Sequence, residues 1–564
     1  MTSSKKRFSW ILLIAVLILI NWIASVAHVR YDLTEEKRYS LSRPTIELLE
    51  NLQEPVQVEV FLKGEFPAGF RKVRNSVEEF LQECKEYAGG KIQYSFTDPL
   101  QGLDDTAAAR LRDSMAYFYD IPVFTLQAPS KVGDELTQKL VFPGAVIRYR
   151  DTTVGVNLLK GERSFGTEPE QLAALYNNVE ASMEYKFASA IQKATSEKKQ
   201  SVGYALGNGE AWGYNVDDAV RTLISAYNFD TVNIKTDPVI PQYDALVIMK
   251  PTVPFSNEDK MKIDQYVMHG GKVFWMVDNM YAEFDSLYKS GGFVAFDRAL
   301  NLEDLLFNYG VRMNQALLQD MQSDQLPQVS PDGQQRLVDW PFFPILNGTA
   351  HPISKNLDGV RAMFPTALDT VEAAGISKTV LLQSSTNARL MEAPAKIDFE
   401  FLQIAPDQRL FSQKNVPVAM LLEGSFNSLY ANRISTELRQ VMGALNYDIR
   451  NRSEANRMIV VADGDLATNP VSPQYGPLQM GSNVFTRYTF ANKDFFLNAM
   501  EYLVNPTDIL QTRAKQFSLR LLDPRRTEAE QTRWQLVNIA LPILLVVIAG
   551  FIYQQWRRKR FASK

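Results

Sequence analysis

A long apolar run lies near each end of this chain of 564 residues, and the two runs constrain its fold most. Residues 536–553 contain one polar interruption, Asn538, and residues 8–29 contain four. A helix rises 1.5 Å per residue, so about twenty apolar residues cross a bilayer core of about 30 Å. We therefore predict one transmembrane helix within residues 1–29 and a second at 534–556.

The first apolar run has an alternative interpretation. Ser25-Val26-Ala27 resembles the small-x-small cleavage site of a secretory signal peptide. The run is long for the apolar part of a signal, which favours an uncleaved anchor.

Positive residues flank both runs on their outer sides, and positive flanks stay in the cytoplasm. We therefore expect both termini in the cytoplasm, a basic tail at 557–564, and a large body on the far side of the membrane that is anchored at both of its ends. The residues that set this orientation are Lys5, Lys6, Arg7, Arg557, Arg558, Lys559 and Arg560.

The body between the two runs is acidic. Removing the eight positive charges at the two ends from the net charge of −4 leaves −12 for residues 8–556. This balance argues against nucleic acid as a partner. The one cysteine, Cys84, excludes an intramolecular disulfide and lies in an amphipathic pattern typical of a buried thiol. Three histidines, far apart in the sequence, supply zinc chemistry poorly.

Residues 30–195 alternate strand and helix patterns in the order β-α-β-α-β-β-α, which predicts a thioredoxin-like domain. Ile121-Pro122 falls where that fold often carries a proline before its third strand. No CxxC is present, so thioredoxin-type redox chemistry is excluded. The expected strands are 56–64, 91–99, 121–127 and a hairpin over 140–159, and the expected helices are 70–88, 104–118 and 168–193.

Residues 196–510 predict a second α/β domain with a parallel, doubly wound sheet. Buried strand patterns alternate with helices, and Ser256 is the expected N-cap of a helix over 256–271. Periodicity weakens over 281–395, which we interpret as an insertion with local structure of its own. Residues 511–533 form the expected linker to the second membrane helix.

Polar residues gather where the predicted strands of this second domain end, and ligands bind beyond the carboxyl ends of such strands. The carboxylates suit a divalent cation or a sugar. The alternative is that these residues cap helices and close turns, as most α/β folds require there. The residues that we single out as ligand-binding candidates are Asn208, Glu210, Asp278, Asp463 and Asp465; Lys250-Pro251, Asn279 and Asn469 lie in the same clusters.

Signatures of common enzymes are missing. The sequence GNGE lacks the GxGxxG spacing of a dinucleotide site, and neither a P-loop nor a GxSxG elbow occurs. Asp463 and Asp465 stand two residues apart on one turn, whereas paired catalytic carboxylates normally come from different elements. We therefore predict no enzymatic activity, no catalytic residues, no bound metal and no cofactor.

Several long blocks resemble the auxiliary component of ABC transport systems in the gliding machinery of Bacteroidetes. They include RYDLTEEKRYSLSRPTIELLENLQEPVQVEVF, YDALVIMKPTVPFSNEDKMKIDQYVMHGGKVFWMVDN, VVADGDLATN and the closing NIALPILLVVIAGFIYQQWRRKR. The resemblance implies a non-catalytic membrane partner of an ABC permease and a separate ATPase. It also implies a central domain related to glutamine amidotransferases and to a domain of intraflagellar transport proteins. The amidotransferase cysteine has no counterpart, because Cys84 lies in the earlier domain.

Three hypotheses remain. The first is a structural subunit that docks beside the permease and supports gliding motility. The second is a solute-binding module that captures a sugar, peptide or cation, and the third is a hydrolase that uses the same carboxylates. An assembly with more than one copy of the chain is left open.

Overall fold

The computed structural model describes residues 40–505 and 524–561, together with residues 16 and 18, except for gaps at 65, 67, 120, 122, 130–135, 160–168, 197–198, 330–334, 356, 403–405, 432–447 and 475. Apart from residues 16 and 18, the predicted first membrane segment therefore lies outside the described residues, as do the basic residues before it, Pro122 and most of the predicted linker. The chain divides into two compact units, Met1–Gln516 and Phe517–Lys564. The predicted α/β class is confirmed for the first unit.

A four-stranded sheet comes first in the chain, with the strand order β2-β1-β5-β6. β1 and β2 are parallel, whereas β5 is antiparallel to both β1 and β6. The turn at Arg150, which adopts a left-handed φ of 50°, joins β5 to β6 where the sequence predicts a hairpin. The strands are β1 (Val56–Val60), β2 (Ile92–Phe96), β5 (Gly144–Tyr149) and β6 (Thr152–Asn157).

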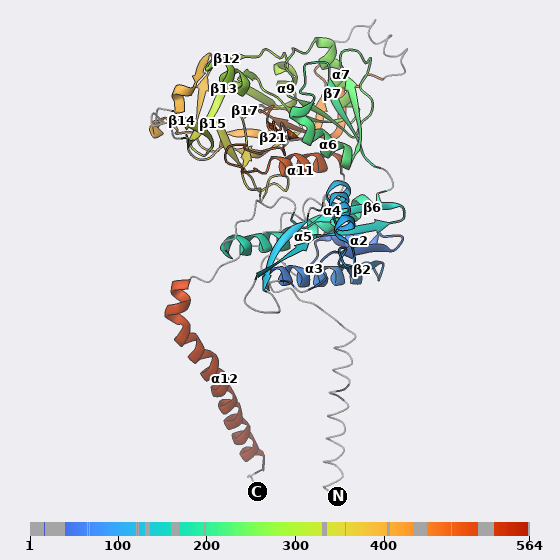
Figure 1. Cartoon of the computed structure of the whole chain (residues 1–564), viewed down its shortest axis with the longest axis vertical. Helices are drawn as coiled ribbons and strands as arrows, with labels where there is room; N and C mark the ends of the chain where they lie inside the picture. The colour runs from blue at the N-terminus through green and yellow to red at the C-terminus, as the bar shows by residue number, and fades with distance from the viewer. Residues whose placement is uncertain are drawn as a thin grey trace. The chain divides into compact units, whose positions relative to one another are not determined.

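Helices cover both faces of this sheet. α3 and α5, which lie side by side in Figure 1, pack on one face around a core that includes Leu81 and Phe187. Cys84 belongs to the same core and is fully buried, which confirms the predicted buried thiol. Met115 of α4 lies in a separate core with Val146. The helices are α2 (Arg43–Glu50), α3 (Ala68–Tyr87), α4 (Asp105–Tyr119) and α5 (Pro169–Thr195).

The strand predicted over 121–127 lies outside the four-stranded sheet. Residues Phe124–Pro129 form β3, which pairs only with β4 (Leu136–Val141) in a two-stranded hairpin. The third strand of the four-stranded sheet is β5, which begins at Gly144. The predicted strand at 121–127 therefore exists in part as β3, but it does not pair within the four-stranded sheet.

The second sheet begins with five parallel strands in the order β22-β10-β9-β7-β8. β7, the first of these strands in the chain, lies between β8 and β9. The chain therefore adds β8 on one side of β7 and then adds β9, β10 and β22 on the other side. Strands β9 and β10 are almost wholly buried, as their continuous apolar sequences predict. The strands are β7 (Ser201–Leu206), β8 (Asn228–Asn233), β9 (Ala245–Met249), β10 (Lys272–Met276) and β22 (Arg452–Val461).

Helices lie on both faces of this parallel part. Phe274 of β10 stacks on Phe496 of α11, whereas Trp275, the next residue, contacts Phe255 just before α7. Successive side chains of a strand point to opposite faces, so α7 and α11 cover opposite faces. Ser256 caps α7 as predicted. The helices are α6 (Asp217–Ala226, after the 3-10 turn Tyr214–Val216), α7 (Asn257–Met268) and α11 (Asn492–Val504).

Antiparallel strands extend the same sheet beyond β22. The order continues β22-β21-β18-β15-β14, with β16 paired to β15. Four of these strands, β14, β15, β16 and β18, belong to the stretch that the sequence suggests is an insertion, so that stretch contributes to the main sheet as well as to structure of its own. The strands are β14 (Ser323–Val329), β15 (Gln335–Gly348), β16 (Val360–Arg361), β18 (Ile376–Gln383) and β21 (Pro417–Asn427).

Smaller elements complete the body. Two three-stranded sheets have the orders β11-β12-β20 and β17-β13-β19, and β23 pairs with β24. The bounds are β11 (Met280–Tyr281), α8 (Phe284–Ser290), β12 (Gly292–Asp297), α9 (Glu303–Tyr309), β13 (Val311–Asp320), β17 (Thr366–Thr370), β19 (Ala388–Glu392), β20 (Ala395–Asp398), the 3-10 turns Phe399–Leu402 and Gln408–Leu410, β23 (Val471–Ser472) and β24 (Gly476–Pro477).

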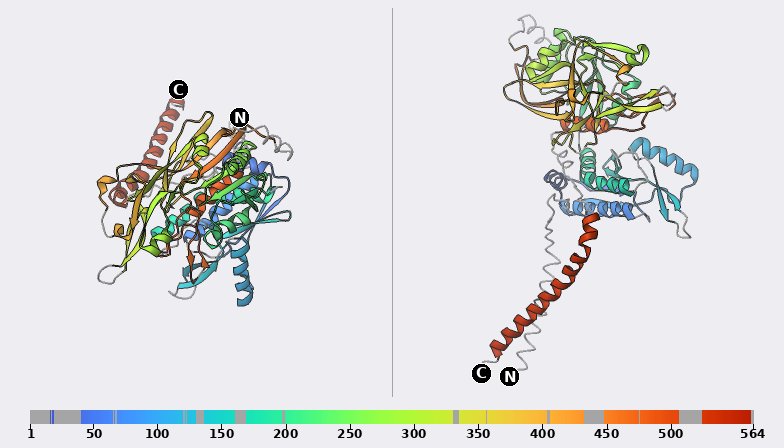
Figure 2. Two further views of the ribbon diagram at one scale, coloured as in Figure 1. Left: turned by 90° about the horizontal axis from the view of Figure 1, so that it is seen from above. Right: turned by 90° about the vertical axis from the view of Figure 1, so that its left-hand side faces the viewer.

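The second unit contains α12 (Pro524–Phe561), one continuous helix in Figure 2. Its segment Arg533–Lys559 has a mean hydropathy of 2.5 over its most apolar window, and none of that window is buried among the described residues. Pro542 lies inside the helix without interrupting it. By length and composition, this segment is a candidate membrane span, in agreement with the prediction at 534–556.

Candidate functional site

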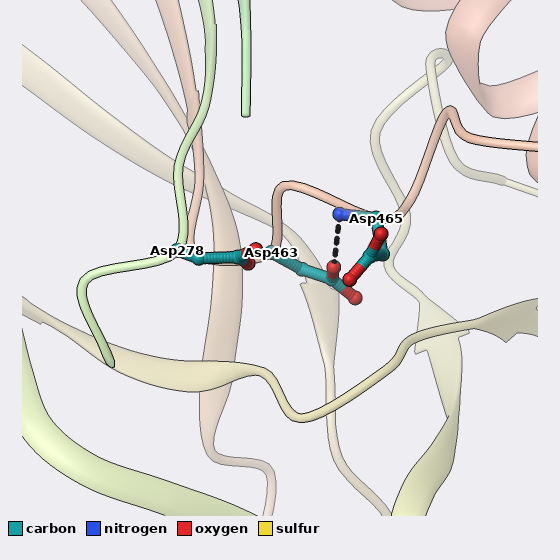
Figure 3. A group of neighbouring side chains, drawn as sticks. All are labelled: Asp278, Asp463 and Asp465. Atoms are coloured by element: carbon teal, nitrogen blue, oxygen red, sulfur yellow. Dashed lines mark hydrogen bonds between the residues drawn. The ribbon is translucent and has the colours of Figure 1, made fainter. Parts of the chain in front are cut away.

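Three aspartates meet at the carboxyl end of the second sheet. Asp278 follows β10, and Asp463 and Asp465 follow β22, which is the parallel neighbour of β10. One carboxylate oxygen from each lies within 4.8 Å of the others. Figure 3 shows Asp278 pointing towards Asp463 from the opposite segment. The structure thus brings together three of the five predicted ligand-binding residues.

Backbone amides hold two of these carboxylates. Asp463 accepts hydrogen bonds from the amides of Asp465, at 2.7 Å, and Met363, at 2.8 Å. The first of these is the dashed line in Figure 3. Asp278 accepts one from the amide of Gly464 at 2.5 Å. These bonds tie the turn after β22 to β10.

Lys250, which follows β9, supplies the counter-charge. Its Nζ lies 2.6 Å from Asp465 Oδ1, 2.9 Å from Glu283 Oε2 and 3.6 Å from Asp278 Oδ2. Its side chain is 13% exposed. Lys250 adopts a left-handed φ of 48°, a conformation that costs an L-residue roughly 1–2 kcal/mol.

A second cation closes the outer side of this cluster. Arg298 Nη2 lies 2.6 Å from Glu283 Oε1, so Glu283 bridges Arg298 and Lys250. The guanidinium of Arg298 also stacks over the ring of Tyr281, 5.4 Å from its centroid. We name these six residues the strand-end cluster: Lys250, Asp278, Glu283, Arg298, Asp463 and Asp465.

Burial and mutual repulsion shift the pKa values inside the strand-end cluster. Burial raises the pKa of Asp278 to about 7, although Lys250 opposes the shift, and the charge of Asp465 adds to it. Burial, with the charges of Asp278 and Asp465, raises the pKa of Asp463 well above its usual range. Burial lowers the pKa of Lys250, but its carboxylate neighbours outweigh that effect, so its pKa is raised. The ammonium of Lys250 is therefore charged throughout the physiological range.

The arrangement is an ion-pair cluster in which two cations, Lys250 and Arg298, face four carboxylates. Oxygen ligands in this number suit Mg²⁺ or Ca²⁺, but such an ion would have to displace the Lys250 ammonium from Asp465 and Asp278. Asp463 has both oxygens engaged by backbone amides. Asp278 Oδ2 is buried without a hydrogen-bond partner in the described part of the chain, and its nearest cation is the Lys250 ammonium at 3.6 Å. The ion pairs and the amide contacts of the other oxygens favour a structural role.

Asn208 and Glu210, the other two predicted residues, lie in a separate network after β7. Glu210 Oε2 accepts from the amide of Asn208 at 2.7 Å, and Asn208 Nδ2 donates to Asp259 Oδ2 at 3.3 Å. Asp259 in turn completes the capping box of α7 with Ser256. Burial raises the pKa of Glu210. This network closes a turn and fixes the start of α7, while Asn208 Oδ1 and Glu210 Oε1 are buried without a hydrogen-bond partner among the described residues. A ligand-binding role for Asn208 and Glu210 stays a prediction.

Sequence reasoning missed part of the strand-end cluster. Glu283 and Arg298 come from the stretch interpreted as an insertion, and no local pattern marks them. The sequence identifies Lys250 as a polar residue at the end of a strand, but it does not reveal that Lys250 balances the charges of the aspartates. Asn469, also at a predicted strand end, bonds instead to the backbone of Asp218 and Tyr214, and so fixes the loop before α6.

Removal of the Lys250 charge tests the structural role. We expect Lys250→Met to lower the free energy of unfolding by about 3–5 kcal/mol, because a buried ion pair that loses one partner leaves uncompensated charge. The loss should be smaller at pH 5 than at pH 8, since the carboxylates protonate more readily without the lysine. Chemical denaturation measures both effects. Lys289→Met, on the exposed face of α8, is the matched control, and an equal loss in both variants would contradict the role.

The raised pKa of Asp278 predicts a pH dependence. A carboxyl group whose pKa is higher in the folded chain binds protons more tightly there, so its contribution to stability is complete below about pH 4 and is lost as the pH rises through 7. Asp278→Asn should flatten the decline in unfolding free energy between pH 4 and pH 7. Asp285→Asn, at an exposed position of α8, should leave the decline unchanged. A parallel pH profile for Asp278→Asn and the original chain would refute the assignment.

The chain was compared with curated proteins and with solved structures. A search of curated proteins finds no match. A solved structure described as "mmIFT52 N-terminal domain" is similar over 54% of this chain and 97% of its own length, with 12% sequence identity and a TM-score of 0.31. That score is too low to carry an argument about fold or function.

Two family models match the sequence. Residues 35–148 match a domain of unknown function, DUF7088, and this region contains most of the four-stranded sheet. Residues 199–499, more than half of the chain, match the auxiliary family described as "ABC-type uncharacterized transport system". This second region contains the whole strand-end cluster. The chain therefore belongs to the family of auxiliary proteins of ABC-type transport systems, and its partners are components of such a system.

Proposed function

We propose that the chain is a non-catalytic accessory subunit that acts as a scaffold within an ABC transporter complex. The observation that carries this proposal is the strand-end cluster. The second sheet ends where doubly wound proteins usually bind ligands, and there its carboxylates are bound by Lys250 and by backbone amides. A position that is closed in this way supports a structural role more than capture of a cation or hydrolysis.

The partners in this proposal are an ABC permease and a separate ATPase, and the process is gliding motility. The sequence blocks quoted above support it, because they resemble GldG, the auxiliary protein of the Bacteroidetes gliding machinery. The chain has no P-loop for ATP hydrolysis. An energy-dependent role would therefore depend on a partner that hydrolyses ATP.

We also propose that the two α/β domains have a thioredoxin-like and a flavodoxin-like fold. The order β2-β1-β5-β6, with only β1 and β2 parallel, supports a thioredoxin-like first domain. In the second sheet, the parallel strands taken in chain order as one to five have the spatial order 2-1-3-4-5, which supports a flavodoxin-like core.

We also propose a two-pass topology in the inner membrane, with the body in the periplasm. The apolar segment Arg533–Lys559 and the basic residues that follow Trp556 support the second crossing. The first crossing rests on the sequence of residues 8–29 and the KKR before it.

Protease protection tests this topology. An epitope tag at either terminus should resist protease added to intact spheroplasts, because both ends are expected in the cytoplasm. A tag inserted at residues 330–334, between the antiparallel strands β14 and β15, should be cleaved. Lysed spheroplasts, in which all three tags should be cleaved, are the control. Cleavage of either terminal tag in intact spheroplasts would overturn the two-pass assignment.

Co-purification tests the scaffold role. The tagged full chain, solubilised in mild detergent, should capture a permease and an ATPase that are identified by mass spectrometry. Replacement of residues 534–556 with an unrelated transmembrane helix of equal length should greatly reduce the permease yield, if the helix docks against it. Lys289→Met, at an exposed body position, should leave the yield unchanged.

Two outcomes would contradict the proposal. Absence of both components from the captured material would remove the accessory role itself. Full capture by the helix-replaced chain would place the contact on the body instead of the membrane segment.

A further inference from the structure

One polar residue, Asn538, interrupts the apolar run 536–553 of α12, which Figure 2 shows as one continuous helix. Trp534 and Trp556 flank this run, as aromatic residues do at the two surfaces of a membrane, and Leu545 is midway between them. Asn538 is seven residues from Leu545. That is about 10 Å along the helix axis, whereas half of a bilayer core is about 15 Å thick. In the second crossing proposed above, Asn538 therefore lies within the hydrocarbon.

Pro542 removes a hydrogen-bond donor from the same turn of α12. In an α-helix the carbonyl of residue 538 accepts from the N–H of residue 542, and proline has no N–H. The side chain of Asn538 forms no hydrogen bond within the described residues. This turn therefore presents a set of groups that need partners: the backbone oxygen of Asn538, its Oδ1, and the two N–H bonds of its Nδ2.

Lipid cannot supply those partners. Hydrocarbon tails neither donate nor accept hydrogen bonds, and a polar group without a partner is costly there. None of the most apolar window of α12 is buried among the described residues. Backbone groups that a proline frees inside a membrane are commonly satisfied by neighbouring helices. A second helix that carries polar groups at the depth of Asn538 would therefore be favoured beside α12.

Asn538 and Pro542 belong to one face of α12. Positions alternately four and three residues apart return to the same side of a helix, and they form the contact seam of left-handed helix pairs. Ala549 lets a second helix approach closely, since small residues favour such contacts in membranes. Leu545 and Ile552 are 58% and 62% exposed, so the described residues leave this face uncovered. We name five residues the asparagine seam: Asn538, Pro542, Leu545, Ala549 and Ile552.

The hydrogen-bonding groups of the asparagine seam match those of a second copy of the chain. Each copy contributes two oxygens and two N–H bonds at Asn538, so a pair of copies has equal numbers of donors and acceptors. In a parallel pair related by a two-fold axis, the two asparagines face each other at the same depth. Asparagines that pair across helices in this way favour helix association. The symmetry supplies the complementary groups without a third molecule.

Like charges oppose the pairing, but they lie outside the apolar run. Residues 8–556 carry a net charge of −12, and residues 557–560, which follow the run, are all basic. At physiological salt, charges in water are largely screened beyond about 8 Å. Pairing should therefore tighten as the salt concentration rises.

We propose that α12 pairs in parallel with α12 of a second copy of this chain along the asparagine seam. In each copy, Asn538 Nδ2 donates to the backbone oxygen or Oδ1 of Asn538 in the other copy. The pairing rests on the second membrane crossing proposed above and goes beyond the scaffold role. It would place two copies of the accessory subunit side by side in the membrane.

Oxidative cross-linking of the full chain in its own membranes tests which face of α12 is in contact. Leu545→Cys lies on the asparagine seam, where paired helices come within reach of a disulfide, so it should give a cross-linked dimer on a non-reducing gel. Val547→Cys is the matched control, because it lies at nearly the same depth but about 200° around the helix axis. It should give no dimer. The original chain shows the background, since its one cysteine, Cys84, is fully buried.

Dilution of the labelled full chain in lipid vesicles, followed by fluorescence energy transfer, measures the dissociation constant of the pair. Asn538→Leu should weaken association roughly three- to thirtyfold, the range found for polar contacts between membrane helices. Asn538→Gln, which keeps the amide, should retain most of the affinity. Val547→Leu, on the opposite face, should leave the constant unchanged. A leucine that merely altered the helix itself would not be corrected by glutamine.

Several results would overturn the pairing. They are equal cross-linking through residues 545 and 547, cross-linking through residue 545 only to a different protein, and equal dissociation constants for Asn538→Leu and the original chain. A monomeric chain that still captures permease and ATPase would refute the pairing and leave the scaffold role intact. Failure of the membrane crossing itself would appear separately, in the protease test of the carboxyl-terminal tag.

Discussion

The ion pairs of Lys250 are the interaction on which the second sheet depends. The lysine follows β9, Asp278 follows β10 and Asp465 follows β22, so one ammonium joins the ends of three neighbouring strands. Several carboxylates brought together in a buried place would repel one another and favour separation of the strands. The lysine offsets that repulsion at the point where the strands end. The left-handed backbone that it adopts is the local cost of placing the charge there.

Local signals in the sequence predicted much of the fold. The apolar runs of β9 and β10, the N-cap Ser256 and the polar strand ends were all visible, because each depends on residues that are close in sequence. The antiparallel half of the second sheet was not visible. β15 contains Pro341 and Pro344, and β13 is irregular between Met313 and Leu317, so neither presents a regular two-residue alternation. The separation of Asn208 and Glu210 from the aspartates is likewise a matter of distant pairing, which a single sequence does not encode locally.

One strand end serves two different environments. The alternation of side chains after β10 sends Asp278 into a closed set of ion pairs and Asn279 into the floor of an open cavity. In the first environment Lys250 offsets part of the carboxylate charge, and in the second the Nδ2 of Asn279 has no hydrogen-bond partner among the described residues. Polar residues at the ends of parallel strands therefore do not all have the same role. Neighbouring positions can join the ion pairs of the sheet and line an open cavity at the same time.

The position of β22 in the sheet has a consequence for synthesis. β22 pairs with β10, yet Gly464 and Asp278, which bond to each other, are 186 residues apart in the chain. At ribosomal speeds of about 5–20 residues per second, β10 waits roughly 10–40 s for its neighbour. Throughout that time its apolar edge is open, and parallel pairing over such a distance is slow once it begins. A chaperone that covers nascent strand edges would therefore matter more for this protein than for one whose adjacent strands are consecutive.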